Sequence, residues 1–409
     1  MSLGDLSSWL SELIKPYDGL LKFGGLIVGP AFAALGFWLS RVDKQELTDK
    51  AEMAARSEAE ARRAHQDLTW KQAELDDARG KVEKRELDIR RLEENIRRLT
   101  DRSEDLWKVK KAQPFPLYKT WQADERGAKI VTIGNLKGGV GKTTIAANLA
   151  AYISETRNLP VLLVDLDYQG SLSNMMMLAA EKTDVESRVE TLFNPTASPV
   201  EIAEAQVHLA PKLKQAWLTP ANYTFAKLEN VLLAKWLVEE KQHFDARYLL
   251  SQFLLRPEIR RDYAAIILDM PPRLTLGSLN ALVASHYFVV PTVLDKLSAE
   301  AVATFLTQMK NIAVDLDLSL KLAGIVGTLS RAENLSASEQ RAFDLAREAG
   351  HAWEDGKDFM FSSVIPRRAA IGRSAGEDIA YMAGDNPSRT TARVAFDPLC
   401  AEILTRIGL

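Results

Sequence analysis

Cysteine is almost absent from this chain, and its scarcity excludes one class of protein. Among 409 residues only Cys400 carries a thiol, so no internal disulfide framework is possible, and the composition fits a reducing compartment. The formal net charge is −3, which provides no overall basic field of the kind that attracts nucleic acid. The five histidines are scattered along the chain without the spacing of a metal site.

Charge is missing altogether from residues 23–40. Extended back past Lys22 to Leu20, this run is long enough to cross a bilayer. Trp38 near its end and Arg41 just beyond it suit the boundary between lipid and water. A transmembrane helix is therefore the favoured interpretation. A cleaved signal peptide, a buried helix of a soluble domain, and an interfacial hairpin bent near its central proline are the alternatives.

The segment boundaries at this end of the chain follow from that interpretation. We predict an N-terminal segment at residues 1–18 and the transmembrane helix at 19–40. The part of the chain that follows the span is expected in the cytoplasm, in agreement with Arg41, Lys44 and Lys50 just beyond it. The predicted location is the inner (cytoplasmic) membrane, crossed once.

Glycine is nearly absent from residues 41–111, where it occurs only at Gly80, and charges of both signs are interleaved there. Apolar residues recur at every seventh position, namely Leu47, Ala54, Ala61, Leu68, Leu75, Val82, Ile89 and Ile96. The second seam position is interrupted by Lys71 and Arg85. A sustained heptad with charged flanks predicts a coiled coil that self-associates; a lone charged helix is the alternative. Paired prolines then open a linker at residues 112–127.

Beyond the linker the chain contains one complete phosphate-binding pattern. It reads Asn135-Leu136-Lys137-Gly138-Gly139-Val140-Gly141-Lys142-Thr143-Thr144. An apolar run at 129–133 precedes it and predicts a strand, and apolar residues at helical spacing follow it. Glycines allow backbone N–H groups to surround phosphate oxygens, and a helix N-terminus adds its dipole. Lys142 would then neutralise the β- and γ-phosphates, and the Thr143 hydroxyl would reach Mg²⁺.

This loop resembles the deviant Walker A loop of the ParA/MinD family of ATPases, in which a second lysine stands where Lys137 does. The resemblance continues at residues 165–171, where only Tyr168 departs from the family's pattern by replacing its usual proline, and at 266–272, which look like the Walker B strand and switch. It covers residues 128–409. It implies an α/β fold, a doubly wound and mostly parallel sheet of the P-loop NTPase type.

The resemblance also implies individual roles, although each carboxylate taken alone could be an ordinary strand-end residue. Asp165 and Asp269 would hold Mg²⁺ through its waters, because this ion loses water reluctantly, and Thr143 would be a direct ligand. Asp167 would orient the attacking water, and Lys137 would reach the nucleotide of a partner subunit. The predicted catalytic residues are therefore Asp167, Lys137 and Lys142. The predicted nucleotide contacts are Gly138, Gly139, Val140, Gly141, Lys142, Thr143, Thr144 and, beside the adenine, Arg367.

We predict a membrane-anchored ATPase that binds ATP and Mg²⁺, dimerises on ATP and hydrolyses it slowly to recruit or position an unknown protein partner. A homodimer or larger homo-oligomer is expected, held by the coiled coil and the ATP interface. Two alternatives are an oligomeric membrane assembly that ATP merely stabilises, and a bacterial tyrosine kinase-like protein. Nonspecific DNA binding is a weaker hypothesis that rests on C-terminal arginines, namely Arg367, Arg368, Arg373, Arg389 and Arg393.

Overall fold

The computed structural model describes residues 44–100, 106–183, 186–238, 244–331, 335–368, 371, 379–381 and 387–409. The chain divides into two compact units, Met1–Glu94 and Asn95–Leu409, and each is described by itself. The predicted segments 1–18 and 19–40 lie outside the described residues.

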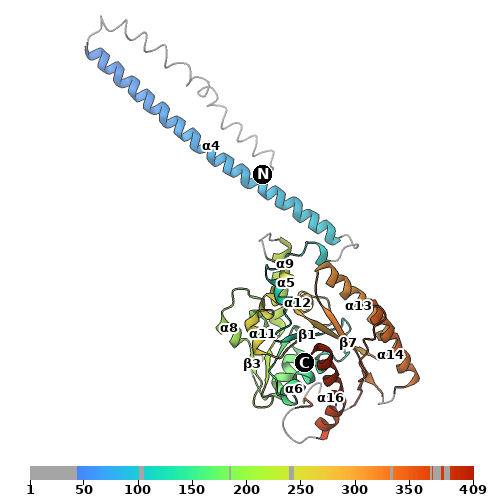
Figure 1. Ribbon diagram of the computed structural model, residues 1–409. Helices are drawn as coiled ribbons and strands as arrows, with labels where there is room; N and C mark the ends of the chain where they lie inside the picture. Colours follow the sequence, from blue (N-terminus) through green and yellow to red (C-terminus); the bar gives the residue numbers. More distant parts are fainter. Residues whose placement is uncertain are drawn as a thin grey trace. The chain divides into compact units, whose positions relative to one another are not determined.

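A single helix, α4 (Lys44–Thr100), occupies most of the segment predicted as a coiled coil (Figure 1). Its 57 residues correspond to a length of about 85 Å. Charged side chains pair along its surface, as where Arg62 Nη2 lies 2.7 Å from Glu58 Oε1. The seam residues Ile89 and Ile96 are 54% and 58% exposed. The helical conformation thus agrees with the prediction, whereas pairing with a second helix stays a prediction.

The predicted location in the membrane is wrong. None of the helices in the described part of the chain combines the length and the apolar character that a bilayer crossing requires. Helix α4 is long enough, but charged residues recur on every turn, and such side chains are costly in hydrocarbon. The proposed span itself, residues 19–40, lies outside the described residues.

One eight-stranded sheet, in the order β3-β4-β2-β5-β1-β6-β7-β8, organises the C-terminal unit. Neighbouring strands are parallel except for the antiparallel pair β3 and β4. The strands are β1 (Lys129–Ile133), β2 (Val161–Asp165), β3 (Val207–His208), β4 (Ala216–Thr219), β5 (Ala265–Asp269), β6 (Tyr287–Val293), β7 (Lys321–Ser330) and β8 (Ile365–Pro366). The central strands are almost wholly apolar, as strands covered on both faces must be. The predicted doubly wound α/β fold is confirmed.

Helices cover both faces of this sheet (Figure 1). One apolar cluster joins the sheet to α6 (Lys142–Glu155), α7 (Ser171–Ala179) and α16 (Pro387–Ile407). The other cluster includes α9 (Tyr223–Val238), α10 (Leu249–Leu254), α12 (Leu276–Ala284), α13 (Lys296–Asp315) and α14 (Ala337–Ala349). Shorter elements are η2 (Leu106–Lys108), α5 (Tyr118–Ala123), η3 (Val189–Phe193), α8 (Pro199–Glu204), η4 (Ala246–Tyr248), α11 (Pro257–Asp262) and η5 (Gly350–Ala352). Successive residues of β1 alternate between the clusters, as the pleat requires.

The stretch that precedes β1 packs into this unit. Tyr118 is fully buried. Asp245 and Arg247 form a buried ion pair of 2.6 Å, and Arg247 Nη1 donates to the carbonyl of Trp107 at 2.6 Å. Residues 112–127, predicted as a linker, are therefore held against the same core as the sheet. The predicted domain boundaries stay predictions, and these contacts favour an earlier start of the sheet domain.

His286 gives the fold a pH dependence. Its Nδ1 accepts a hydrogen bond from the amide of Ile130 at 3.0 Å. Burial, followed by the positive charges of Arg260, Lys129 and Lys321, lowers the pKa of His286 to about 3. The unfolded chain binds a proton below the ordinary histidine pKa of about 6.5, whereas the folded chain does not. The contribution of His286 to the stability of the fold is therefore fully present above about pH 6.5, and it is lost as the pH falls towards 3.

Because His286 takes up a proton on unfolding, we expect the free energy of unfolding to fall by up to about 1.4 kcal/mol for each unit by which the pH is lowered within that window. Urea denaturation at several pH values between about 7 and 5 should show a steeper loss for the wild type than for His286→Gln, which lacks the titrating ring. Equal pH slopes for the two proteins would contradict the assignment.

Candidate functional site

The loop between β1 and α6 has the backbone that phosphate binding needs. Gly139 and Gly141 have φ values of 72° and 89°, which favour glycine over residues with a side chain. Gly141 is also the N-cap of α6. A Cβ atom at Gly138 or Gly139 would meet nothing within 4 Å, so this side of the loop faces open space. A phosphate group can therefore approach the loop at the N-terminus of α6.

Lys142 is the first residue of α6 and is only 7% exposed. Its Nζ donates to the carbonyl of Lys137 at 2.9 Å, which folds the side chain back along the loop. Burial lowers the pKa of Lys142, while the charges of Asp269 and Asp167 act in the opposite direction. The ammonium group thus contacts the loop backbone and is close enough to Asp269 and Asp167 for their charges to act on it.

Two buried carboxylates meet at the ends of neighbouring strands, because Asp165 on β2 is in register with Asp269 on β5. Asp165 Oδ2 accepts from the amide and hydroxyl of Ser173 at 2.9 and 2.7 Å, and its Oδ1 accepts from the amide of Asp167 at 3.0 Å. Asp269 Oδ2 accepts from Thr143 Oγ1 at 2.8 Å. Its buried Oδ1 finds no hydrogen-bond donor among the described residues.

This pair of acids fits a divalent cation. Burial raises the pKa of Asp165 to about 7. Burial and the neighbouring charge of Asp165 raise the pKa of Asp269 well above its ordinary value. A cation would favour the ionised forms and satisfy the oxygen of Asp269 that lacks a donor. No cage of three or more histidine, cysteine or carboxylate side chains occurs in the described part of the chain, and Mg²⁺ usually keeps waters and phosphate oxygens instead.

Lys137 does not point towards these carboxylates. Its Nζ donates to Ser298 Oγ and lies 3.9 Å from Asp295 Oδ2. Asp295 is the N-cap of α13, and its side chain accepts from the amide of Ser298 at 2.8 Å. Within a single chain the second lysine of the loop is therefore held by α13. Nothing in the local sequence pattern indicated this partner, because it lies about 160 residues further along the chain.

A cleft of about 520 Å³ lies over the loop. Predicted residues that line it are Gly138, Gly139, Gly141, Lys142, Thr143, Thr144, Asp167 and Arg367. Val140 is buried instead, and its carbonyl accepts from Thr328 Oγ1 at 3.0 Å. Sequence reasoning missed Thr328, Leu329, Ile371 and Phe396, which also line the cleft. Leu329 has a φ of 57°, a strained conformation of the kind found at functional sites.

Tyr168, the residue that departs from the ParA motif, contacts the loop after β5. The Arg273 guanidinium lies 5.5 Å from the centre of the Tyr168 ring, and Arg273 Nη2 donates to Tyr168 Oη. The ring of Tyr223 packs against Tyr168 edge to face at 6.3 Å. The loops that follow β2 and β5 are thereby joined by side chains.

Sequence comparisons agree with this geometry. A family profile described as an AAA domain matches residues 128–322. An uncharacterized protein from Pseudomonas putida is 31% identical over 279 residues, which cover 68% of this chain and 95% of the relative. The chromosome-partitioning ATPase Soj of Thermus thermophilus is 30% identical over 279 residues, with 68% and 96% covered. The chain belongs to the ParA/Soj family of P-loop ATPases.

Solved structures support the same fold. The ATP complex of an McdA variant from Cyanothece superposes with a TM-score of 0.54 at 16% identity, covering 69% of this chain and 97% of that one. A putative plasmid partition protein from Borrelia burgdorferi bound to AMPPNP gives a TM-score of 0.51 at 20% identity, with 69% and 100% covered. At these identities the likeness concerns the fold alone. The matched profile begins just before β1 and ends at residue 322, so it does not include α4.

Proposed function

We propose that this chain binds Mg²⁺-ATP in the cleft and hydrolyses ATP to ADP and phosphate as a molecular switch. The observation that carries the proposal is the meeting of Lys142, Thr143 and the two buried carboxylates Asp165 and Asp269 around one glycine loop. The oxygen of Asp269 that lacks a donor among the described residues supports an ion or its water at that position.

In this proposal the protein positions the reactants and stabilises charge. The loop amides and Lys142 would bind the β- and γ-phosphates. Thr143 would bind Mg²⁺ directly, and Asp165 and Asp269 would hold it through water. When bound, this ion neutralises negative charge on the phosphates. Arg367 lines the same cleft as the phosphate loop, which supports its proposed contact with the nucleotide.

Asp167 is proposed to orient the attacking water. It lines the cleft, and its Oδ1 accepts from the amide of Gln169 at 3.0 Å, which fixes the carboxylate in the loop after β2. The water oxygen would bond to the γ-phosphorus while the bond from that phosphorus to the β–γ bridging oxygen breaks, and the proton of the water would leave with the phosphate product or solvent.

Lys137 is proposed to act on the nucleotide of a second subunit. Its side chain is 42% exposed, so its contacts with Ser298 and Asp295 are worth little and can be exchanged. On ATP-dependent dimerisation the ammonium group would leave α13 and reach the phosphates of the partner. ATP would then be part of the dimer interface, and hydrolysis would weaken it.

Helix α4 is proposed to bring the subunits together before ATP binds. The exposed seam residues Val82, Ile89 and Ile96 lie seven residues apart and would be covered in a parallel or antiparallel pair. Self-association through α4 would raise the local concentration of the ATPase domains. An unidentified protein partner, and nonspecific DNA as the weaker alternative, stay predictions that rest on the family resemblance.

Two variants separate binding from hydrolysis. Asp167→Ala should bind Mg²⁺-ATP within about threefold of the wild type but lower phosphate release at least about a hundredfold, because it removes the group that orients water. Lys142→Ala should lose nucleotide binding itself. Phosphate release and ATP affinity are measured side by side, with the exposed Asp355→Ala as the charge-matched control. Phosphate release that survives in Asp167→Ala would refute the role given to Asp167.

Mixed dimers test the action of Lys137 across the interface. Lys137→Ala and Lys142→Ala should each be inactive alone. In a co-expressed mixture, a Lys137→Ala subunit can bind ATP and receive Lys137 from its partner, so phosphate release should recover to a fraction of the wild-type rate, on the order of one quarter. A mixture as inactive as its components would show that Lys137 acts only within its own chain.

Light scattering tests the proposed helix pairing. The double variant Val82→Glu with Ile89→Glu places charge in the seam and should shift nucleotide-free protein towards the monomer mass. The control, Gln66→Glu with Ala73→Glu, adds the same charge on the opposite side of the helix and should keep the wild-type mass. Loss of mass in both variants, or in neither, would argue against the heptad seam.

A further inference from the structure

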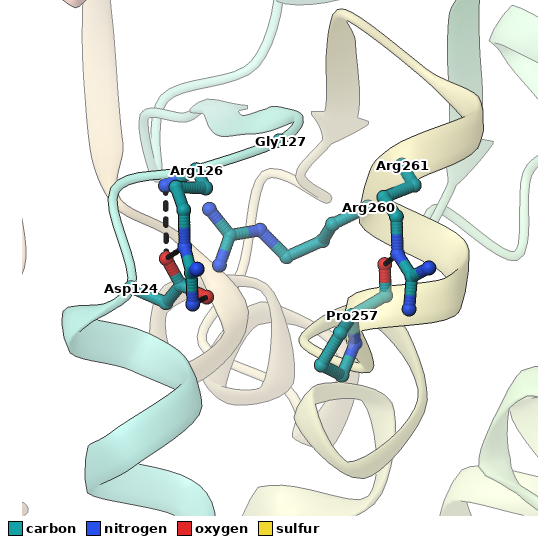
Figure 2. A pocket seen from close by; sticks show the side chains of 6 residues that line it. All are labelled: Asp124, Arg126, Gly127, Pro257, Arg260 and Arg261. Carbon is teal, nitrogen blue, oxygen red and sulfur yellow. Dashed lines mark hydrogen bonds and ion pairs between the residues drawn. The ribbon is translucent and has the colours of Figure 1, made fainter.

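A second hollow lies at the opposite end of β1 from the phosphate loop. It has a volume of about 340 Å³ and is lined by Asp124, Arg126, Gly127, Pro257, Arg260 and Arg261 (Figure 2). These residues come from the segment that leads from α5 into β1 and from α11. The cleft over the phosphate loop shares none of them, so the two hollows are separate.

Arg260 is the buried cation of this hollow, with 2% of the residue exposed. Its Nε donates to the carbonyl of Ala128 at 3.2 Å, and its Nη1 donates to the carbonyl of Trp121 at 3.1 Å. The buried Nη2 finds no acceptor among the residues that the structure describes. Figure 2 shows the side chain extending from α11 towards the segment that carries Asp124 and Arg126. A buried guanidinium with an unbonded N–H group is costly, and an anion would offset this cost best because it supplies both an acceptor and the opposite charge.

The carboxylate of the hollow, Asp124, attracts Arg260 through its charge but leaves Arg260 Nη2 without a hydrogen bond. Asp124 is the carboxylate among its lining residues, and it is already bound by Arg126, whose Nε and Nη2 donate to it at 2.9 and 3.1 Å. These bonds hold the pKa of Asp124 down to about 2, so it stays an ionised partner of Arg126. Arg260 and Arg261 add two further guanidinium groups to the same lining.

Backbone packing makes this arrangement possible. Gly127 has a φ of 79°, and a Cβ atom there would lie 2.7 Å from the carbonyl oxygen of Arg260. The next amide, that of Ala128, donates to the same oxygen at 2.7 Å. The close approach of this segment to α11 therefore requires glycine. It fixes Arg260 and the neighbouring arginines on two elements that are anchored to the sheet.

We propose that this hollow binds a small phosphate-type oxyanion, either inorganic phosphate or the phosphate group of a small phosphomonoester. Arg260 Nη2 is the buried donor, and the exposed side chains of Arg126 and Arg261 would contact the remaining oxygens through the N–H groups that Asp124 and Pro257 do not bind. The planar fork of a guanidinium matches the spacing of two phosphate oxygens, which makes arginine the preferred residue for this recognition. The volume accommodates a phosphate with waters or a short attached group.

Calorimetric titration of the full chain with inorganic phosphate tests the proposal. The phosphate loop is kept filled with Mg²⁺-ADP, or is disabled in a Lys142→Ala background, and chloride keeps the ionic strength constant. The test variant is Arg126→Gln with Arg261→Gln, two exposed residues whose replacement preserves Arg260. The control, Arg157→Gln with Arg341→Gln, removes the same charge elsewhere on the surface.

We expect phosphate to bind with the loop filled and equally in the Lys142→Ala background. The test variant should bind it at least about tenfold more weakly, while the control should stay within about twofold of the parent, because charge-assisted hydrogen bonds are lost only in the former. Glycerol 3-phosphate that displaces phosphate assigns the site to phosphomonoesters, and failure to displace it assigns the site to the free ion.

Absence of binding once the loop is filled, or binding that the test variant leaves unchanged, would overturn the proposal. Arg260→Lys supplies a second test, since lysine keeps the charge but cannot present Nη2. Circular dichroism establishes that this variant is folded before it is titrated. If it does not fold, the double variant decides the outcome by itself. The result is independent of ATP hydrolysis, because it is read with the phosphate loop occupied or disabled.

Discussion

The pairing of β2 with β5 is the constraint on which the candidate nucleotide site depends. Its register sets Asp165 opposite Asp269, both buried, at the edge of the sheet where the phosphate loop begins. Burial raises the pKa of both carboxylates, and the charge of Asp165 raises the pKa of Asp269 further. The donors from Ser173 and Thr143 offset part of this cost. A cation bound between the two carboxylates would offset more of the cost of burying them, so cation binding would stabilise this edge of the sheet.

Contacts between loops connect this edge to the rest of the unit. Tyr168 and Arg273 join the segments after β2 and β5, at the position where the ParA motif usually has a proline. Glu229 of α9 makes a further connection, because its Oε1 accepts from the amide of Gly277 at the start of α12 at 2.7 Å. Burial raises the pKa of Glu229. The helix that follows the Walker B strand is thus held by a side chain from a segment that carries no family motif.

The region before β1 consists of an exposed, charged helix and a shorter segment that packs against the sheet domain. Helix α4 is charged on every turn and exposes its apolar seam, which favours a partner helix and is incompatible with a bilayer crossing. Residues 106–127 instead pack with the sheet domain, through the ion pair of Asp245 and Arg247 and the buried ring of Tyr118. Gly127 then turns the chain into β1 against α11. The stretch predicted as a linker therefore packs against the sheet domain and leads directly into β1, the strand that precedes the phosphate loop.

The sequence by itself determined the fold class and the position of the phosphate-loop pattern, and it singled out Asp165, Asp167 and Asp269, whose roles stay predictions, because each of these features depends on residues close together in the chain. A strand, a glycine turn and a helix impose a fixed local spacing, and a heptad does the same for α4. Only the tertiary structure decided that Ser298 holds Lys137, that Leu329 and Phe396 line the cleft, and that Arg260 is buried without an acceptor among the described residues. Those relations join segments far apart in the chain, and local periodicity carries no information about which distant segments pack together.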